Sequence, residues 1–420
     1  MFNLPQQGMA LSSDTDDGND VVPPNPLTAE TTASKRLRSS IETLTSPSPS
    51  SEDSLHSMPL PALPFDIVVE ILSILPVKLL MQFQCVCKSW KSLISDPKFA
   101  KKHLRHASQS LMLTLRNPSL DFVVIANPLS SVFTEATTSA IQVEYPLKYK
   151  NHSAVIVGSC HGILCLSFCF AINKGVVFLW NPSIRKFTKL PSLEEIYRTT
   201  FCFSFGYDDF SDSYKVVVVC FPHNAIDDRP VSNCKNVVKV HTLGTTSWRR
   251  ISGFPPNTLI LDKSGKFLSG TINWLSYRQN CSSCWVIISL DLEKEFYREL
   301  PQPDYGEINL LSLNTGVLRD CFCIFSSSDT FSDVWLMKEY GNKDSWTKLF
   351  RFPHTRNLGT WPHVSALYVS QDDQVLFDIQ LAELVVYNSR DGTFKDPGIQ
   401  IIGKWMGSEV YHESLMSPCF

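Results

Sequence analysis

The sequence predicts an α+β multidomain chain, in which a disordered tail and a small all-α domain precede an all-β repeat domain. Three observations predict this fold class: composition changes near residue 57, apolar residues then recur at helical spacing, and short β-type runs fill about 300 further residues. The chain of 420 residues is too long for one typical core. The expected division is 1–57, 58–106, 107–405 and a C-terminal tail at 406–420.

Residues 1–57 are expected to form the disordered tail. They contain 11 Ser, 6 Thr, 6 Pro and 8 acidic residues, and Phe2 is their only aromatic residue. Such a segment cannot bury enough apolar surface to offset the entropy lost on ordering. Within it, Lys35 to Arg38 form a short basic cluster, a weak match to a nuclear import signal. The expected compartment is therefore the cytoplasm, the nucleus or both.

Residues 58–106 are predicted to form three short helices. Their apolar residues recur at spacings of three and four, and Pro76 and Pro97 interrupt the pattern. The five apolar residues of the first helix are expected on one helical face: Ile67, Val68, Ile71, Leu72 and Leu75.

This helical domain carries more apolar side chains than one three-helix core needs. A domain this small buries only about 60% of its surface and is marginally stable alone. Two interpretations follow. It is a subdomain packed on the larger body, or a helical hook whose surplus apolar face binds a partner protein.

The same residues resemble the F-box of plant F-box proteins. The resemblance rests on these stretches: Leu63-Pro64, Ile71-Leu72, Leu75-Pro76-Val77, Phe83, Cys85 to Trp90, and Leu93 to Pro97 with Phe99. It implies that this domain binds a Skp-family adaptor and, through it, a cullin. The residues assigned to the F-box core and the adaptor contact, which sequence cannot separate, are Leu63, Pro64, Ile71, Leu72, Leu75, Pro76, Val86, Trp90, Leu93 and Ile94.

The β region contains an internal repeat made of a strand, a polar turn, a strand with an aromatic residue, and a proline. Successive aromatic residues are 61, 48, 50 and 48 positions apart, and they are Phe187, Trp248, Phe296, Trp346 and Phe394. A period near 50 is typical of four-stranded kelch-type propeller blades. We expect about six propeller-like units, with the aromatic residue packed between neighbouring blades. The long first step predicts an inserted loop at 208–213 or 223–236.

This half resembles the F-box-associated, kelch-related domain of the same plant family. The matching stretches are Gly158 to Leu164, Trp180-Asn181-Pro182, Phe205 to Asp208, and Tyr214 to Val217. The double-glycine signature of kelch blades is not evident, so blade count and ring closure stay open.

The sequence predicts no cofactor, no metal and no catalytic residue. Cys281 and Cys284, with Cys321 and Cys323 downstream, suggest zinc, but the gap is long and C-x-C in a strand places both thiols on one core face. His161 is interpreted as a packed residue, and the acidic pair Asp208–Asp209 as a solvated turn.

Charge and hydropathy exclude two further classes of partner. The net charge of −3 is the sum of −5 at 1–57, +4 at 58–106 and −2 in the rest, so the argument against nucleic acid applies to the nearly neutral β region. The basic cluster at 98–105 is interpreted as a solvated helix face. No run of 18 apolar residues exists, which argues against a membrane helix.

The predicted function is that of a substrate receptor in an SCF-type (cullin–RING) ubiquitin ligase. The resemblance implies that the F-box binds the adaptor and the β domain binds an unidentified target protein, with no bond chemistry by the chain itself. The alternatives are an adaptor-binding scaffold that recruits no ligase and a kelch-like carbohydrate binder.

Overall fold

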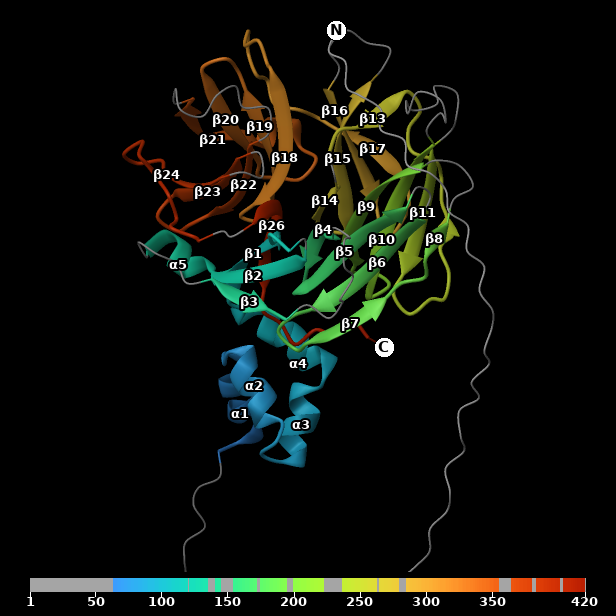
Figure 1. Cartoon of the computed structure of the whole chain (residues 1–420), viewed down its shortest axis with the longest axis vertical. Helices are drawn as coiled ribbons and strands as arrows, with labels where there is room; N and C mark the ends of the chain where they lie inside the picture. Colours follow the sequence, from blue (N-terminus) through green and yellow to red (C-terminus); the bar gives the residue numbers. More distant parts are fainter. Residues whose placement is uncertain are drawn as a thin grey trace, which may run out of the picture. The chain divides into compact units, whose positions relative to one another are not determined.

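A computed structural model of the chain describes most residues after position 62 (Figure 1). The described ranges are 63–119, 121–134, 140–144, 154–171, 174–194, 199–222, 236–262, 264–278, 285–354, 364–379, 383–400 and 403–419. The predicted tail at 1–57 lies outside them, as do Cys281 and Cys284.

Four short helices, rather than the three predicted, begin the described chain. They are α1 (Phe65–Ser73), α2 (Val77–Phe83), α3 (Lys88–Ile94) and α4 (Pro97–His103), and the 3-10 turn η1 (Leu104–His106) follows. Pro97 ends α3 and also begins α4, because proline suits the first turn of a helix. The Asp96 side chain caps α4 by accepting a hydrogen bond from Lys98 N at 2.7 Å. None of the helices in the described part of the chain is long and apolar enough to cross a membrane.

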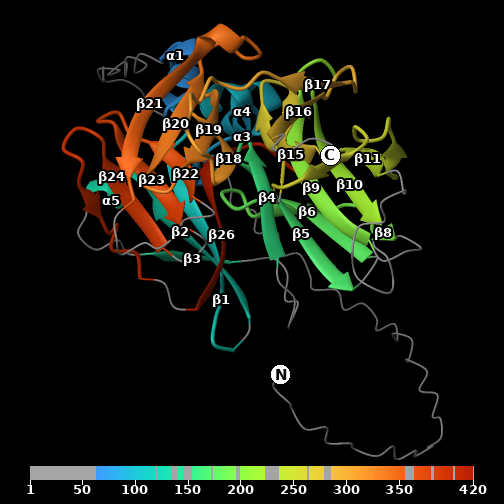
Figure 2. The same cartoon turned by 90° about the horizontal axis from the view of Figure 1, so that it is seen from above.

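The β region forms six antiparallel sheets, arranged as the blades of a propeller (Figures 1 and 2). Blade I contains β26 (Lys404–His412), β1 (Gln109–Arg116), β2 (Phe122–Pro128) and β3 (Ile141–Val143). Blade II contains β4 (Ala154–Cys160), β5 (Ile163–Ala171), β6 (Lys174–Asn181), β7 (Lys186–Lys189) and β8 (Leu193–Glu194). Blade III contains β9 (Thr199–Asp208), β10 (Ser213–Pro222), β11 (Val237–Thr242) and β12 (Arg249–Arg250).

The other three blades follow the same order along the chain. Blade IV contains β13 (Thr258–Ile260), β14 (Lys266–Leu268), β15 (Thr271–Arg278), β16 (Trp285–Asp291) and β17 (Tyr297–Leu300). Blade V contains β18 (Ser312–Leu318), β19 (Cys321–Ser327), β20 (Phe331–Met337) and β21 (Trp346–Pro353), with the 3-10 turn η2 (Lys343–Ser345) before β21. Blade VI contains β22 (Val364–Val369), β23 (Gln374–Ile379), β24 (Glu383–Asn388) and β25 (Phe394–Lys395).

The two ends of the β region close the ring. Strand β26 pairs with β1 antiparallel, with Gln109 opposite His412 and Arg116 opposite Lys404. It also contacts β4 and β22, the first strands of the two neighbouring blades. In Figure 2, β4, β18, β22 and β26 lie near the centre of the ring. The β domain therefore extends beyond residue 405, where the sequence analysis placed the start of a C-terminal tail.

The five repeat units found in the sequence are the last hairpins of blades II to VI. These hairpins are β6–β7, β11–β12, β16–β17, β20–β21 and β24–β25. The corresponding strands of blade I are separated by α5 (Leu129–Thr134), so the sixth unit has no repeat signal. Residues 208–213 form only a tight turn between β9 and β10, which leaves 223–236 for the inserted loop. That segment, apart from Asn236, lies outside the described residues.

Three of the five repeat aromatic residues pack between blades. Phe394 is half-buried against the cluster that blades V and VI share, and the other two are the tryptophans. Trp248 Nε1 donates to Pro191 O at 2.7 Å, and Trp346 Nε1 donates to Pro301 O at 3.0 Å. Each bond joins a blade to the preceding one, as predicted. For Phe187 and Phe296 the prediction is wrong, because their side chains are 41% and 49% exposed. A phenyl ring has no N–H that could bind the neighbouring carbonyl.

Candidate protein-docking surface

Helix α1 carries two apolar stripes rather than the single face expected from the sequence. Leu72 is buried, and Val68 and Leu75 pack beside it against the core. Ile67 and Ile71, which the sequence analysis placed on the same face, are 47% and 44% exposed. Residues one position apart on a helix are about 100° apart around its axis, so the second stripe points away from the core.

The outward stripe is part of a set of exposed apolar side chains close together in the sequence, which we call the docking surface. It comprises the seven exposed large apolar side chains of residues 63–86, which are Leu63, Phe65, Ile67, Ile71, Ile74, Leu79 and Val86. They are half of the fourteen such side chains in the described part of the chain. Exposed apolar side chains at this density are common at protein–protein contacts, so these residues are a candidate contact surface.

The structure separates the ten predicted F-box residues into core and surface. Leu72 and Ile94 are buried, and Leu75, Trp90 and Leu93 are half-buried. The exposed members are Leu63, Pro64, Ile71, Pro76 and Val86.

Sequence reasoning did not assign Phe65, Ile67, Ile74 and Leu79 to the contact. The spacing of Ile67, Ile71 and Ile74, at i, i+4 and i+7, is a signal that could have identified the outward stripe.

The helices also share a core with the propeller. One buried cluster joins residues of all four helices to residues of blades II and III. From α4 it includes Phe99 and Ala100, each 4% exposed, and from the C-terminal segment Leu415 and Met416. The first interpretation is therefore correct for one side, which packs on the propeller, while the other side exposes the apolar residues that the second interpretation requires.

Polar contacts of α4 reinforce this packing. Lys101 Nζ donates to Tyr207 Oη at 3.0 Å and to Asp212 Oδ1 at 2.5 Å, and Lys102 pairs with Glu70 of α1. His103 is 2% exposed, and its Nε2 lies 2.8 Å from Leu75 O. The basic cluster is therefore not the fully solvated helix face that we expected.

The C-terminal segment is held by Asn181, from one of the stretches that resemble the F-box-associated domain. Asn181 Nδ2 donates to Ser414 O at 3.0 Å and to Met416 O at 2.8 Å, and Tyr411 Oη donates to Asn181 Oδ1. Gly162 also contacts this C-terminal segment closely. A Cβ at position 162 would lie only 2.3 Å from Ser414 Oγ, so a larger residue would require the segment to shift. Residues far apart in the sequence thus fix the chain end beside the F-box.

His161 lies in the same region and is a packed residue, as predicted. Its ring meets that of Tyr207 edge-on, with the ring centres 4.7 Å apart, and its Nδ1 lies 3.4 Å from Tyr214 Oη. Burial is the main cause that lowers the pKa of His161, which favours the neutral form at neutral pH.

Of the acidic pair Asp208–Asp209, Asp209 is solvated as expected, but Asp208 is buried. The Asp208 carboxylate is 3% exposed and lies 2.8 Å from Lys215 Nζ. Burial alone would raise the pKa of Asp208, but hydrogen bonds from Lys215, Ser211 and Phe210 N, with the charge of Lys215, hold this pKa below its ordinary value. Asp208 and Lys215 therefore form a structural ion pair between β9 and β10.

The cysteines of β19 pack in the core, as the core interpretation predicted. Cys323 is buried, and Cys321 packs half-buried against the same cluster. Burial raises the pKa of both thiols. Among the residues that the structure describes, no group of three or more His, Cys, Asp or Glu side chains is placed to hold a metal ion.

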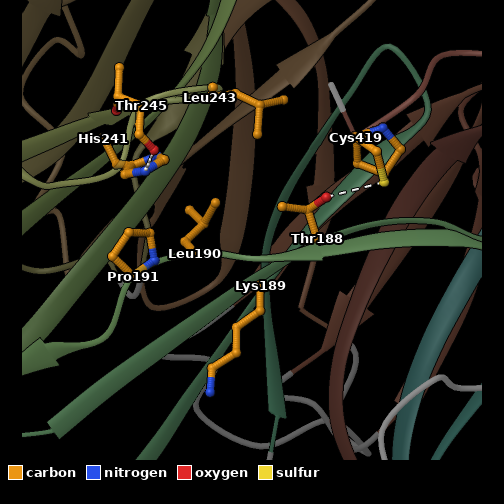
Figure 3. A pocket seen from close by; sticks show the side chains of 10 residues that line it. Thr188, Lys189, Leu190, Pro191, His241, Leu243, Thr245 and Cys419 are labelled. Atoms are coloured by element: carbon orange, nitrogen blue, oxygen red, sulfur yellow. Dashed lines mark hydrogen bonds between the residues drawn. The ribbon is translucent and has the colours of Figure 1, made fainter.

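A shallow pocket of about 260 Å³ lies between blades II and III (Figure 3). Leu190, Leu243 and His241 line it, and Thr188 Oγ1 donates to Cys419 Sγ at its edge. The rest of its lining comes from Lys189, Pro191, Gly244, Thr245 and Pro418.

Comparison with known families identifies this architecture. Residues 60–102 match the F-box domain, and residues 110–378 match the F-box associated beta propeller domain. The chain therefore belongs to the family of F-box proteins with an F-box-associated β-propeller.

Proteins of Arabidopsis thaliana are similar over most of the chain. An F-box/kelch-repeat protein is 31% identical over 370 residues, which cover 85% of this chain and 96% of that relative. The F-box protein CPR1 is 28% identical over 383 residues, which cover 85% of this chain and 89% of CPR1.

Proposed function

We propose that the protein is the substrate receptor of an SCF-type ubiquitin ligase, in which the docking surface binds a Skp-family adaptor. The observation that carries this proposal is the concentration of exposed apolar side chains among residues 63–86, in and beside α1 and α2, whose other side chains pack in the core. Apolar anchors presented by short helices suit a partner with an apolar groove. The adaptor would connect the chain to the cullin. We place this activity in the cytoplasm or the nucleus.

The chain would act by bringing a target close to a conjugating enzyme and would not itself make or break covalent bonds. A receptor that holds a target near a charged conjugating enzyme raises the effective concentration of the target's lysines. This requires a fixed orientation between F-box and propeller. The buried cluster that joins α4 to blades II and III supports it.

The target-binding loops would lie at the ends of the blades that face away from the F-box. The turn after β9 faces α4, as the bonds of Lys101 to Tyr207 and Asp212 indicate. The connections at the other strand ends, such as 301–311 between β17 and β18, are the candidates for binding a target. Leu311 in that connection is 55% exposed.

The test is binding of the purified chain to a purified Skp-family adaptor. We expect Leu63→Ala combined with Ile71→Ala to weaken binding at least ~10-fold, because both side chains are exposed apolar anchors. Ile141→Ala is the matched control, since Ile141 is 62% exposed but lies in blade I. Wild-type affinity of the double variant would contradict the proposal.

A second measurement separates the ligase receptor from a scaffold. We expect the chain–adaptor complex to bind the N-terminal part of a cullin in size-exclusion chromatography. A complex that binds the adaptor but excludes the cullin would favour the scaffold.

A further inference from the structure

Phe210 is the most exposed large apolar side chain of the described chain, with 81% of its surface in water. It lies in the tight turn Asp208–Ser213 between β9 and β10, which we call the Phe210 turn. The fold makes no use of this ring, although a phenyl group gains more than most side chains from burial. A single exposed apolar residue needs no explanation by itself, so the surroundings decide its meaning.

The Phe210 turn is held rigidly. Asp208 Oδ1 accepts a hydrogen bond from Phe210 N at 3.1 Å, and Asp208 Oδ2 accepts one from Ser211 Oγ at 2.6 Å. Asp208 is itself fixed by its ion pair with buried Lys215. The phenyl ring is therefore carried on a pre-organised backbone, which lowers the entropy that a partner must offset on binding.

The turn is also fixed to the F-box. Asp212, at its end, accepts from Lys101 of α4 at 2.5 Å. The next residue, Lys102, pairs with Glu70 of α1, which lies in the sequence between the exposed residues Ile67 and Ile71. Two successive ion pairs thus connect the Phe210 turn to the border of the docking surface. Tyr207, Phe99 and Ala100 pack in one buried cluster beneath them.

This arrangement favours one partner for both surfaces. The Phe210 turn and α1 are each joined by an ion pair to α4, a helix of seven residues. A standard protein interface covers about 800 Å² on each partner, enough to extend across one helix. Asp209, the exposed neighbour of Phe210, adds a negative charge next to the ring. The complementary site is an apolar pocket with a cationic side chain at its rim.

We propose that the Phe210 turn is a second contact for the same Skp-family adaptor that covers the docking surface. Phe210 enters an apolar pocket of the adaptor, and Asp209 faces a cation beside it. The inference rests on the proposed function, and it extends the adaptor interface from the F-box onto blade III of the propeller.

The experiment measures the affinity of the full chain for the purified adaptor by isothermal titration calorimetry. We expect Phe210→Ala to weaken the Kd ~10-fold, since apolar anchors at the centre of an interface carry most of its binding energy. Phe296→Ala is the matched control: Phe296 is 49% exposed, and it lies in the turn before β17 of blade IV. The control should change the Kd less than twofold. Neither substitution should move the thermal midpoint.

Three outcomes separate this inference from the proposed function. If Phe210→Ala binds as wild type while Leu63→Ala with Ile71→Ala loses binding, the inference is wrong and the proposed function stands. If neither variant loses affinity, the proposed function fails. If Phe210→Ala binds the adaptor normally but abolishes a dimer seen by light scattering, the turn is a contact between copies of the chain, which also overturns the inference.

Discussion

Asp208 and Lys215 show how one buried ion pair organises a functional region. Their side chains are 4% and 9% exposed, and Lys215 Nζ also donates to Leu292 O of the next blade at 2.7 Å. Two charges removed from water are tolerated only when their partners are well placed. The pair thus joins blade III to blade IV and also shapes the turn that presents Phe210.

Removing one partner of this pair should be costly. We expect Lys215→Met to lower the free energy of unfolding by ~3–5 kcal/mol, because the Asp208 carboxylate would stay buried without its cation. Arg278→Met is the control, since the pair of Arg278 with Glu299 is exposed and should contribute at most ~1 kcal/mol. Urea unfolding at neutral pH measures both. Equal losses for the two variants would contradict the structural role.

The same carboxylate predicts a dependence of stability on pH. The pKa of Asp208 is lowered in the folded chain, and so is that of Asp333, which is buried against Arg351 and Lys348. Their contribution is therefore complete above the ordinary carboxyl pKa of about 3.9 and is lost as the pH falls through and below it. We expect the thermal midpoint to fall steeply below about pH 4. Asp333→Asn should reduce this slope, and an unchanged slope would argue against the assignment.

At the scale of elements, periodicity predicted the positions of helices and strands better than it predicted which of their faces are buried. The spacing of α1 correctly predicted a helix, but it merged two adjacent stripes into one face. Hydrophobicity alone cannot distinguish a side chain that packs inward from one kept exposed for a partner. Helix α4 was not counted as a separate element, although residues 98–105 were interpreted as a helix face, because Pro97 was interpreted only as a stop signal.

The repeat shows a similar limit. Five hairpins share a turn and an aromatic residue, whereas blade I takes β26 from the far end of the chain and has α5 inside its last hairpin. Pairing between residues about 300 positions apart leaves no local pattern, so ring closure could not be predicted from the sequence.

The two tryptophans of the repeat give a prediction for the blade joints. We expect Trp346→Phe to lower the free energy of unfolding by ~0.5–1.5 kcal/mol, because it removes the hydrogen bond to Pro301 O but keeps an aromatic ring. Phe296→Leu, at an exposed equivalent position, should change it by less than ~0.5 kcal/mol. Thermal unfolding followed by circular dichroism compares the two. A larger loss for Phe296→Leu would show that the tryptophan bond does not join the blades.

At the scale of the molecule, the F-box and the propeller are one compact body. The described residues belong to one compact unit that spans 63–420. Its C-terminal segment contacts both the F-box and the propeller. Strand β26 closes the ring, and Leu415 and Met416 then enter the cluster shared with α4. The matched propeller family ends at residue 378, so this closing segment lies beyond it.

The shared packing of the F-box and the propeller predicts how the molecule unfolds. Because the helices and the blades share one buried cluster, we expect a single cooperative transition in calorimetry rather than separate transitions. Asn181→Ala should lower the midpoint of that whole transition, since it leaves the buried carbonyls of Ser414 and Met416 without their donor. Hydrogen exchange should then increase in α4 as well as in β26. Two resolved transitions, or faster exchange confined to the last residues, would show that the F-box is only loosely attached.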